Sequence, residues 1–383
     1  MSKQKTKTSG QKKKRQRAAV NNRFKLALAG LFLVGFLIVS LVILSTLKQS
    51  YHQVTVPPAE PPDLSLLMQD IQVELESAML RSGASLDRLK VAQQGTAWQL
   101  AVDGIFPDEQ ILAELSLRLH RLAPDLELLV SDRDNRIVLQ KGSKLLFTLI
   151  FSPDKYTPQR HDKPRVAIIM DDLGRDVSVA KQAIALDYQV TMSVLPNERH
   201  ASEIATLAHR RGREVMIHIP MEPEGYPAAN PGEGALFVDL STEEIQRRFM
   251  SYLDRIPYAV GGNNHMGSKF TTDRQGMHTV LELMRREGLF FVDSRTTGSS
   301  IALAEARRLK IPSTARDVFL DNDADVERIA RQIRKLVVLA GKKGSAVGIC
   351  HPHSETLAAL QQQLPLLNRD GIVVVPVSQL TKR

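Results

Sequence analysis

Apolar runs alternate with amphipathic stretches over residues 165–383. Seven runs have the length and composition of buried strands, at 166–170, 190–195, 214–219, 259–261, 290–292, 345–349 and 372–375. Between them, apolar residues recur at helical spacing at 177–186, 202–211, 242–255, 277–287, 300–308 and 324–340. Repeated strand–helix units indicate a parallel α/β sheet. We expect it to close into a barrel whose active face lies at the carboxyl ends of the strands.

Residues 63–152 have a different pattern. One helix is expected from Asp63 and another from Pro107, with strands near 97–102, 126–130, 136–140 and 145–151. This mixture predicts a small α+β domain. It contains no spacing typical of metal ligands or a nucleophile, so we expect packing, assembly or partner binding as its role.

The N-terminal region has the pattern of a membrane anchor. A basic tail at 1–25 precedes residues 26–47, which contain no charged residue. At 1.5 Å per residue, those 22 residues form a helix of about 33 Å, enough to cross a bilayer. The basic tail places the N-terminus in the cytoplasm and the later domains in an extracytoplasmic or periplasmic space. Residues 48–62, rich in proline, are expected to form an extended linker.

The charge distribution argues against a nucleic-acid partner. The chain has a net charge of +9, and ten lysines and arginines with no acidic residue lie in 1–25. The rest of the chain therefore has a net charge of −1. A basic tail beside an apolar span fits attraction to anionic lipid headgroups better than nucleic-acid binding. The single cysteine, Cys350, excludes an intramolecular disulfide.

Polar side chains follow five of the expected strands. The clusters lie at 171–172, 218–222, 263–268, 293–297 and 350–353. The adjacent carboxylates of Asp171 and Asp172 repel each other unless a metal, a proton or a cation offsets them. Because the strand ends of a parallel sheet meet at one edge, carboxylates and imidazoles would converge there. Such groups suit a divalent metal such as zinc.

Each cluster alone also has a structural interpretation. Asp171 and Asp172 could cap a helix from a solvated loop. His218 could be a core histidine satisfied by the backbone, and Asp293 and Arg295 could form an ion pair that fixes a loop. The occurrence of polar clusters at five strand ends favours a functional site.

Residues 165–383 resemble the divergent polysaccharide deacetylase family, a remote branch of the metal-dependent carbohydrate deacetylases with a distorted (β/α) barrel. The stretches that carry the resemblance are AIIMDDLG at 167–174, IHIPME at 217–222, NNHMGS at 263–268, FVDSRTT at 291–297, RDVFLD at 316–321 and GICHP at 348–352. The anchor and the α+β region lie outside the resemblance.

The resemblance implies roles for particular residues. Asp171 would be the catalytic base and Asp172 a metal ligand, with His218 as a second ligand. The family's His-x-x-x-His motif reads His218 to Glu222 here, so its second histidine is absent. Glu222 or His265 is expected to supply the third ligand. His351 stands where the late catalytic acid is usually found.

Two hypotheses follow from these residues. In the first, the chain is a membrane-anchored hydrolase that removes acetyl groups from an envelope polysaccharide or a peptidoglycan-like glycan, with Asp293 and Arg295 orienting His351 or Asp171. In the second, it is a catalytically inactive envelope protein that binds glycan or a partner at a vestigial deacetylase site. The missing second histidine supports the second hypothesis. The sequence does not predict an oligomeric state.

Overall fold

The computed structural model describes residues 64–84, 86, 89–152 and 163–382. The tail, span and linker predicted at 1–25, 26–47 and 48–62 lie outside these residues. Among the helices that the structure describes, none is long and apolar enough to cross a membrane. The chain divides into two units after Leu66, and every described strand belongs to the second, Leu67–Arg383. The expected boundary between the α+β and deacetylase-like regions stays a prediction.

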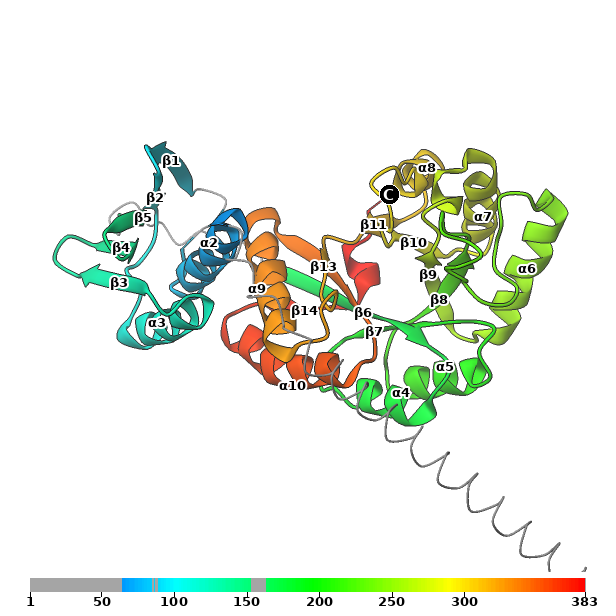
Figure 1. Ribbon diagram of the computed structural model, residues 1–383. Helices are drawn as coiled ribbons and strands as arrows, with labels where there is room; N and C mark the ends of the chain where they lie inside the picture. Colours follow the sequence, from blue (N-terminus) through cyan, green and yellow to red (C-terminus); the bar gives the residue numbers. More distant parts are fainter. Residues whose placement is uncertain (1–63, 85, 87–88, 153–162, 383) are drawn as a thin grey trace, which may run out of the picture. The chain divides into compact units, whose positions relative to one another are not determined.

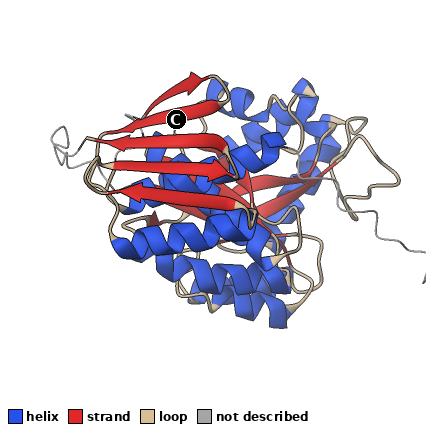
Figure 2. Ribbon diagram, turned by 60° about the vertical axis from the view of Figure 1, so that its left-hand side comes forward, coloured by secondary structure: helices blue, strands red, loops and turns tan. Residues whose placement is uncertain are grey.

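The first part of the larger unit is a five-stranded sheet with two helices. Its elements are α2 (Leu64–Arg81), β1 (Lys90–Gln94), β2 (Ala97–Val102), α3 (Glu109–Leu122), β3 (Leu126–Ser131), β4 (Arg136–Lys141) and β5 (Lys144–Phe151). The strand order is β1-β2-β5-β4-β3, and only β2 and β5 run parallel. Apolar residues of both helices and of the strands form one buried cluster. Figure 2 shows helices on one face of this sheet. The expected α+β pattern is present. The strand β1 was not predicted, because its sequence is mostly polar.

The second part of the unit alternates strands and helices. Its elements are β6 (Arg165–Leu173), α4 (Val177–Ile184), β7 (Thr191–Val194), α5 (Ala201–Arg210), β8 (Val215–Met221), α6 (Thr242–Arg255), β9 (Ala259–Met266), α7 (Arg274–Arg286), β10 (Phe290–Asp293), α8 (Ala302–Arg308), β11 (Ser313–Ala315), β12 (Val318–Phe319), α9 (Val326–Lys343), β13 (Ser345–Cys350), α10 (Ser354–Arg369) and β14 (Val373–Val374). Short 3-10 turns lie at Phe270–Thr272 and Val377–Leu380. Figure 1 follows this run from green to red.

The large sheet is parallel but does not close into a barrel. Its order is β11-β10-β9-β8-β7-β6-β13-β12, and β14 pairs with the start of β6. The terminal strands β11 and β12 are three and two residues long and follow each other in the chain. They have no pairing with each other among the described ladders, so the expected barrel is corrected to an open, curved half-barrel.

Burial on both faces explains the unbroken apolar sequence of β6. Val166, Ile168 and Met170 pack into the core shared with the helices, whereas Ala167 and Ile169 contribute to a second cluster on the other face. Neighbouring residues of a strand point to opposite faces. A strand covered on both sides therefore needs apolar residues at every position, up to the point where Asp171 begins the site.

Candidate metal centre

Asp171 and Asp172 lie at the end of β6, where the strand is irregular. The pairing of β6 with β7 shifts register between Met170 and Leu173, and Asp172 has a left-handed backbone with φ of 56°. Aspartate tolerates this conformation better than most residues do. The irregularity interrupts the alternation of side chains, and both carboxylates approach His218. Its Nε2 lies 3.7 Å from Asp171 Oδ2 and 3.1 Å from Asp172 Oδ1.

The parallel strands β8 and β9 place His218, Asn263 and His265 together. His218 pairs in register with Asn263, and Pro220 pairs with His265. Because side chains alternate along a strand, Asn263 and His265 share one face of β9. On β8, Ile217 and Ile219 point into the apolar core, so the intervening His218 points to the other side. The core thus fixes the direction of the imidazole.

Asp172, His218 and His265 form a group that could hold a metal ion. Asp172 Oδ1 lies 3.1 Å from His218 Nε2 and 2.9 Å from His265 Nδ1, and the two nitrogens are 3.1 Å apart. Ligands of tetrahedral zinc are about 3.3 Å apart, given bonds of about 2.0 Å. Asp172 Oδ1 is also buried without a hydrogen-bond partner. A buried, unpartnered carboxylate oxygen facing two ring nitrogens fits a divalent ion.

Burial and charge have opposite effects on the two aspartates. Burial raises the pKa of Asp171, although the neighbouring His218 and His351 oppose the shift. Burial would also raise the pKa of Asp172, but its contacts with His218 and His265 hold that pKa far below its ordinary value. The pair therefore contains one carboxylate suited to accept a proton and one that stays ionised, as a ligand must.

Asn263 links Asp171 to the group of potential metal ligands. Its Nδ2 donates to Asp171 Oδ1 at 2.9 Å and Oδ2 at 3.0 Å, and its Oδ1 lies 3.1 Å from His218 Nδ1. Ser193 Oγ also donates to Asn263 Oδ1 at 2.6 Å. When His218 is neutral and its Nδ1–H donates to Asn263 Oδ1, the lone pair of the ring is on Nε2. This nitrogen faces Asp172. A hydrogen bond on the remote nitrogen commonly fixes the tautomer of a metal-binding histidine.

His351 approaches the site from the end of β13. Its Nε2 lies 4.0 Å from Asp172 Oδ2, and its Nδ1 lies 3.1 Å from Asp321 Oδ1. Asp321 Oδ2 accepts from the His351 backbone N–H and from Thr356 Oγ1. Burial lowers the pKa of His351, but the Asp321 hydrogen bond and the nearby carboxylates outweigh it and raise the pKa to about 9. His351 is therefore a protonated acid at neutral pH.

Glu222 does not join the metal group. Its Oε1 accepts from Lys269 Nζ at 2.7 Å, and its Oε2 accepts from the Val238 N–H at 2.9 Å. Its backbone oxygen also accepts from the N–H groups of Lys269 and Phe270. Of the two expected alternatives for a third ligand, the geometry favours His265. Glu222 instead forms hydrogen bonds that hold two loops beside β8.

The described contacts of Asp293 lie in the loop after β10, and the expected orienting role of Asp293 and Arg295 stays a prediction. Asp293 accepts from the Arg295 N–H, from Ser300 Oγ and from the Leu303 N–H, so its carboxylate orders the loop after β10. The Arg295 side chain is exposed. Asn263 instead contacts Asp171, and Asp321 contacts His351. Both Asn263 and Asp321 lie in stretches that carried the family resemblance, and that is the signal that could have found them.

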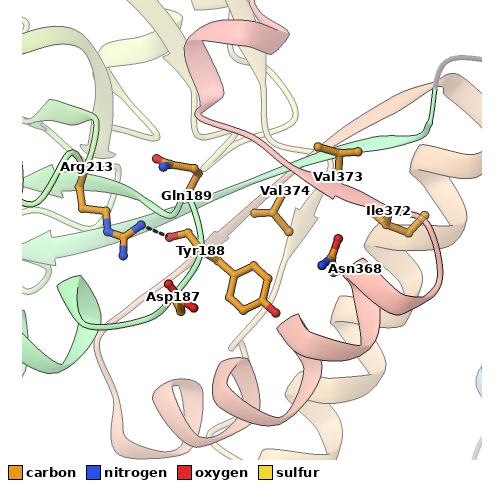
Figure 3. A pocket seen from close by; sticks show the side chains of 8 residues that line it. All are labelled: Asp187, Tyr188, Gln189, Arg213, Asn368, Ile372, Val373 and Val374. Carbon is orange, nitrogen blue, oxygen red and sulfur yellow. Dashed lines mark hydrogen bonds between the residues drawn. The ribbon is translucent and has the colours of Figure 1, made fainter.

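A separate cavity lies at the other end of the strands from the candidate metal centre. It has a volume of about 280 Å³ and is lined by residues 187–189, Arg213, Asn368 and 372–374, as Figure 3 shows. Arg213 there donates to the backbone oxygens of Ile184, Leu186 and Tyr188. These residues lie at the amino ends of the strands. The cavity is therefore distinct from the candidate metal centre.

Comparison with known proteins identifies the family. Residues 168–381 match the model of the divergent polysaccharide deacetylases. The chain is 38% identical over 216 residues to the uncharacterized protein YibQ of Escherichia coli K12, covering 56% of this chain and 67% of that protein. It is 32% identical over 222 residues to an uncharacterized protein of Haemophilus influenzae Rd, covering 58% and 79%. The chain belongs to the divergent polysaccharide deacetylase family.

A solved structure extends this comparison to the fold. A crystal structure of an uncharacterized protein from Agrobacterium tumefaciens C58 is 27% identical to the chain, with a TM-score of 0.56. The match covers 59% of this chain and 91% of that one. The expected family is confirmed, and the similarity is concentrated in the part of the chain that contains the candidate metal centre.

Proposed function

We propose that this protein is a metal-dependent hydrolase that removes acetyl groups from an envelope polysaccharide or a peptidoglycan-like glycan. The observation that carries the proposal is the grouping of Asp172, His218 and His265 between Asp171 and His351. Membership of the deacetylase family supports the substrate class. A divalent ion such as zinc, held by Asp172, His218 and His265, would supply Lewis-acid polarisation of the acetyl carbonyl.

The protein's own residues provide the proton transfers. Asp171 accepts a proton from the water that attacks the acetyl carbon, and its raised pKa makes it a more effective base than an exposed aspartate. His351 donates a proton to the amine or alkoxide that leaves as the bond to the acyl carbon breaks. Asn263 holds Asp171, and Asp321 holds His351. Acetate and the deacetylated sugar are the products.

We also propose that the enzyme acts outside the cytoplasm. The support is the sequence pattern of a basic tail at 1–25 followed by an uncharged span at 26–47. This arrangement anchors the protein in the inner membrane and places its catalytic part on the side where envelope glycans lie. Fractionation of cells and protease protection of spheroplasts test this part of the proposal separately.

The experiment measures metal content and acetate release on the full chain in detergent. Elemental analysis should find at least one zinc or similar ion per chain, and N-acetylated chito-oligosaccharides, O-acetylated xylan and peptidoglycan fragments are the substrates. His218→Ala should lose the ion and the activity, whereas replacement of the exposed His120 by alanine should change neither. A wild-type chain that binds no ion would overturn the proposal. An ion without turnover on any acetylated glycan would favour the inactive glycan-binding protein.

A further inference from the structure

A second group of potential metal ligands lies beside the first. Asp321, His351 and His353 offer a carboxylate oxygen and two ring nitrogens that lie within 4.8 Å of one another. Asp321 follows β12, and the two histidines lie between β13 and α10. One carboxylate and two imidazoles match the donor types that bind zinc in proteins.

Two of these ligands already have a suitable separation. Asp321 Oδ1 lies 3.1 Å from His351 Nδ1, close to the separation of about 3.3 Å between ligands of tetrahedral zinc. Asp321 is buried, and its other oxygen is held by the His351 N–H and Thr356 Oγ1. Oδ1 therefore stays aimed at the ring of His351. This part of the group needs no rearrangement to accept an ion.

His353 completes the group from an exposed position. Its backbone N–H donates to the His351 carbonyl at 2.8 Å, which fixes the turn that joins the two residues. The two rings have centroids 6.0 Å apart. His353 is the residue before α10, but its side chain makes no capping hydrogen bond. This exposed ring can therefore rotate toward Asp321.

The two groups use opposite nitrogens of one histidine. His351 Nδ1 faces Asp321, whereas its Nε2 faces Asp172 at 4.0 Å. None of the three ligands of the first group is needed by the second. We propose that Asp321, His351 and His353 form a second, weaker site for Zn²⁺ or a similar divalent ion, which fills only when the ion is in excess.

Occupation of this site has a consequence for catalysis, which rests on the proposed function. An ion held by Asp321 and His351 Nδ1 would replace the hydrogen bond that orients this ring toward Asp172. Excess zinc should therefore inhibit the enzyme by engaging His351 while the first group stays occupied. The second site is thus inhibitory.

Equilibrium dialysis of the full chain against Zn²⁺, followed by elemental analysis, tests the site directly. The wild-type chain should bind two ions, the second with at least tenfold lower affinity. His353→Asn keeps a residue suited to precede a helix and should bind one. The exposed His120→Ala variant should bind two, as the wild type does. Equal numbers of ions in wild type and His353→Asn would overturn the proposal.

A further variant separates this proposal from the proposed function. His265→Ala should lose the first ion and retain the second, provided that its thermal unfolding shows a folded chain. If the wild type binds an ion that His265→Ala retains and His353→Asn loses, the second site stands even though the proposed active centre fails. Where activity is found, His353→Asn should need at least tenfold more zinc for half inhibition. Unchanged inhibition in that variant would contradict the inhibitory role.

Discussion

Asn263 and Asp171 form a two-point contact in which one amide nitrogen donates to both oxygens of the carboxylate, at 2.9 and 3.0 Å. The amide is completely buried, and its oxygen is engaged by His218 and Ser193. The proposed base and a proposed metal ligand therefore depend on a single side chain. Its replacement should affect both without removing either.

We expect Asn263→Ala to lower the rate of acetate release by about 10- to 100-fold, the usual cost of losing a partner that orients a metal-site residue. The variant should still bind an ion, although less tightly. Steady-state kinetics and a zinc titration on the same preparation measure both effects. Asn230→Ala, a change to an exposed asparagine, is the control and should behave as wild type. A rate within twofold of wild type would remove Asn263 from the site.

Glu222 should contribute to stability and not to ion binding. Glu222→Ala removes the acceptor for the half-buried Val238 N–H and for Lys269, which we expect to cost about 2 kcal/mol of unfolding free energy. Denaturant unfolding measures this cost, and elemental analysis should still find the first ion. Lys269→Gln breaks only the ion pair and should cost less. A folded Glu222→Ala chain without the ion would restore Glu222 as a ligand.

Asp321 should be needed for turnover and not for the first ion. Asp321→Asn keeps the shape of the side chain but removes the charge that holds His351 as an acid. We expect a loss of about 100-fold in kcat, within the range of general acid catalysis. Ion binding by Asp172, His218 and His265 should persist. If kcat were unchanged, His351 would not act as the acid through this pair.

Metal removal should lower the stability of the fold. An ion that binds only the native chain adds about 2.7 kcal/mol when it is present at 100 times its Kd. A chelator should therefore lower the Tm, and Zn²⁺ should restore it. At zinc concentrations too low to fill the second site, Asp172→Asn should show neither effect, because the buried ligand oxygen faces His218 and His265 without its charge. A chelator effect that persists in Asp172→Asn would place the stabilising ion elsewhere.

Glu305 gives stability a dependence on acid pH. A hydrogen bond from Arg308 is the main cause that lowers the pKa of Glu305 to about 2; burial opposes it, and His278 adds to the lowering. The ionised form is thus favoured in the folded chain. Its contribution is fully present above the ordinary pKa of 4.5 and is lost as the pH falls toward 2.

The difference in unfolding free energy between wild type and Glu305→Gln should therefore be largest near pH 7 and shrink below about pH 4.5. Denaturant unfolding at pH 7, 5 and 4 measures it. Glu282→Gln, an exposed pair with Arg285, is the control and should show a smaller difference at pH 7. A difference that stayed constant with pH would contradict this origin.

The strands that carry the site could be predicted from the sequence, but the open form of the sheet could not. The run 166–170 reads as a buried strand because both of its faces are covered, and the structure confirms it as part of β6. The strands β11 and β12 are too short to produce a periodic pattern, so the open edge was not predictable. The helix α10 was also missed, since Pro365 interrupts its pattern.

The same contrast applies to the site. His218 and Asp172 lie at the ends of recognisable strands and could be proposed from position alone. The choice between Glu222 and His265 required the register of β8 against β9, which no local pattern specifies. Asp321 and His351 are joined across 30 residues of sequence, so their hydrogen bond depends on the pairing of β12 with β13. Long-range register decides these contacts.

The left-handed backbone of Asp172 also limits how this position can change in evolution. Glycine, asparagine and aspartate are the residues that adopt this conformation most readily. The backbone conformation alone would allow all three residues at this position, whereas metal binding requires the carboxylate. A single change to asparagine or glycine could thus remove the ligand and leave the fold intact. The residue at this position should therefore distinguish family members that are hydrolases from those that are catalytically inactive.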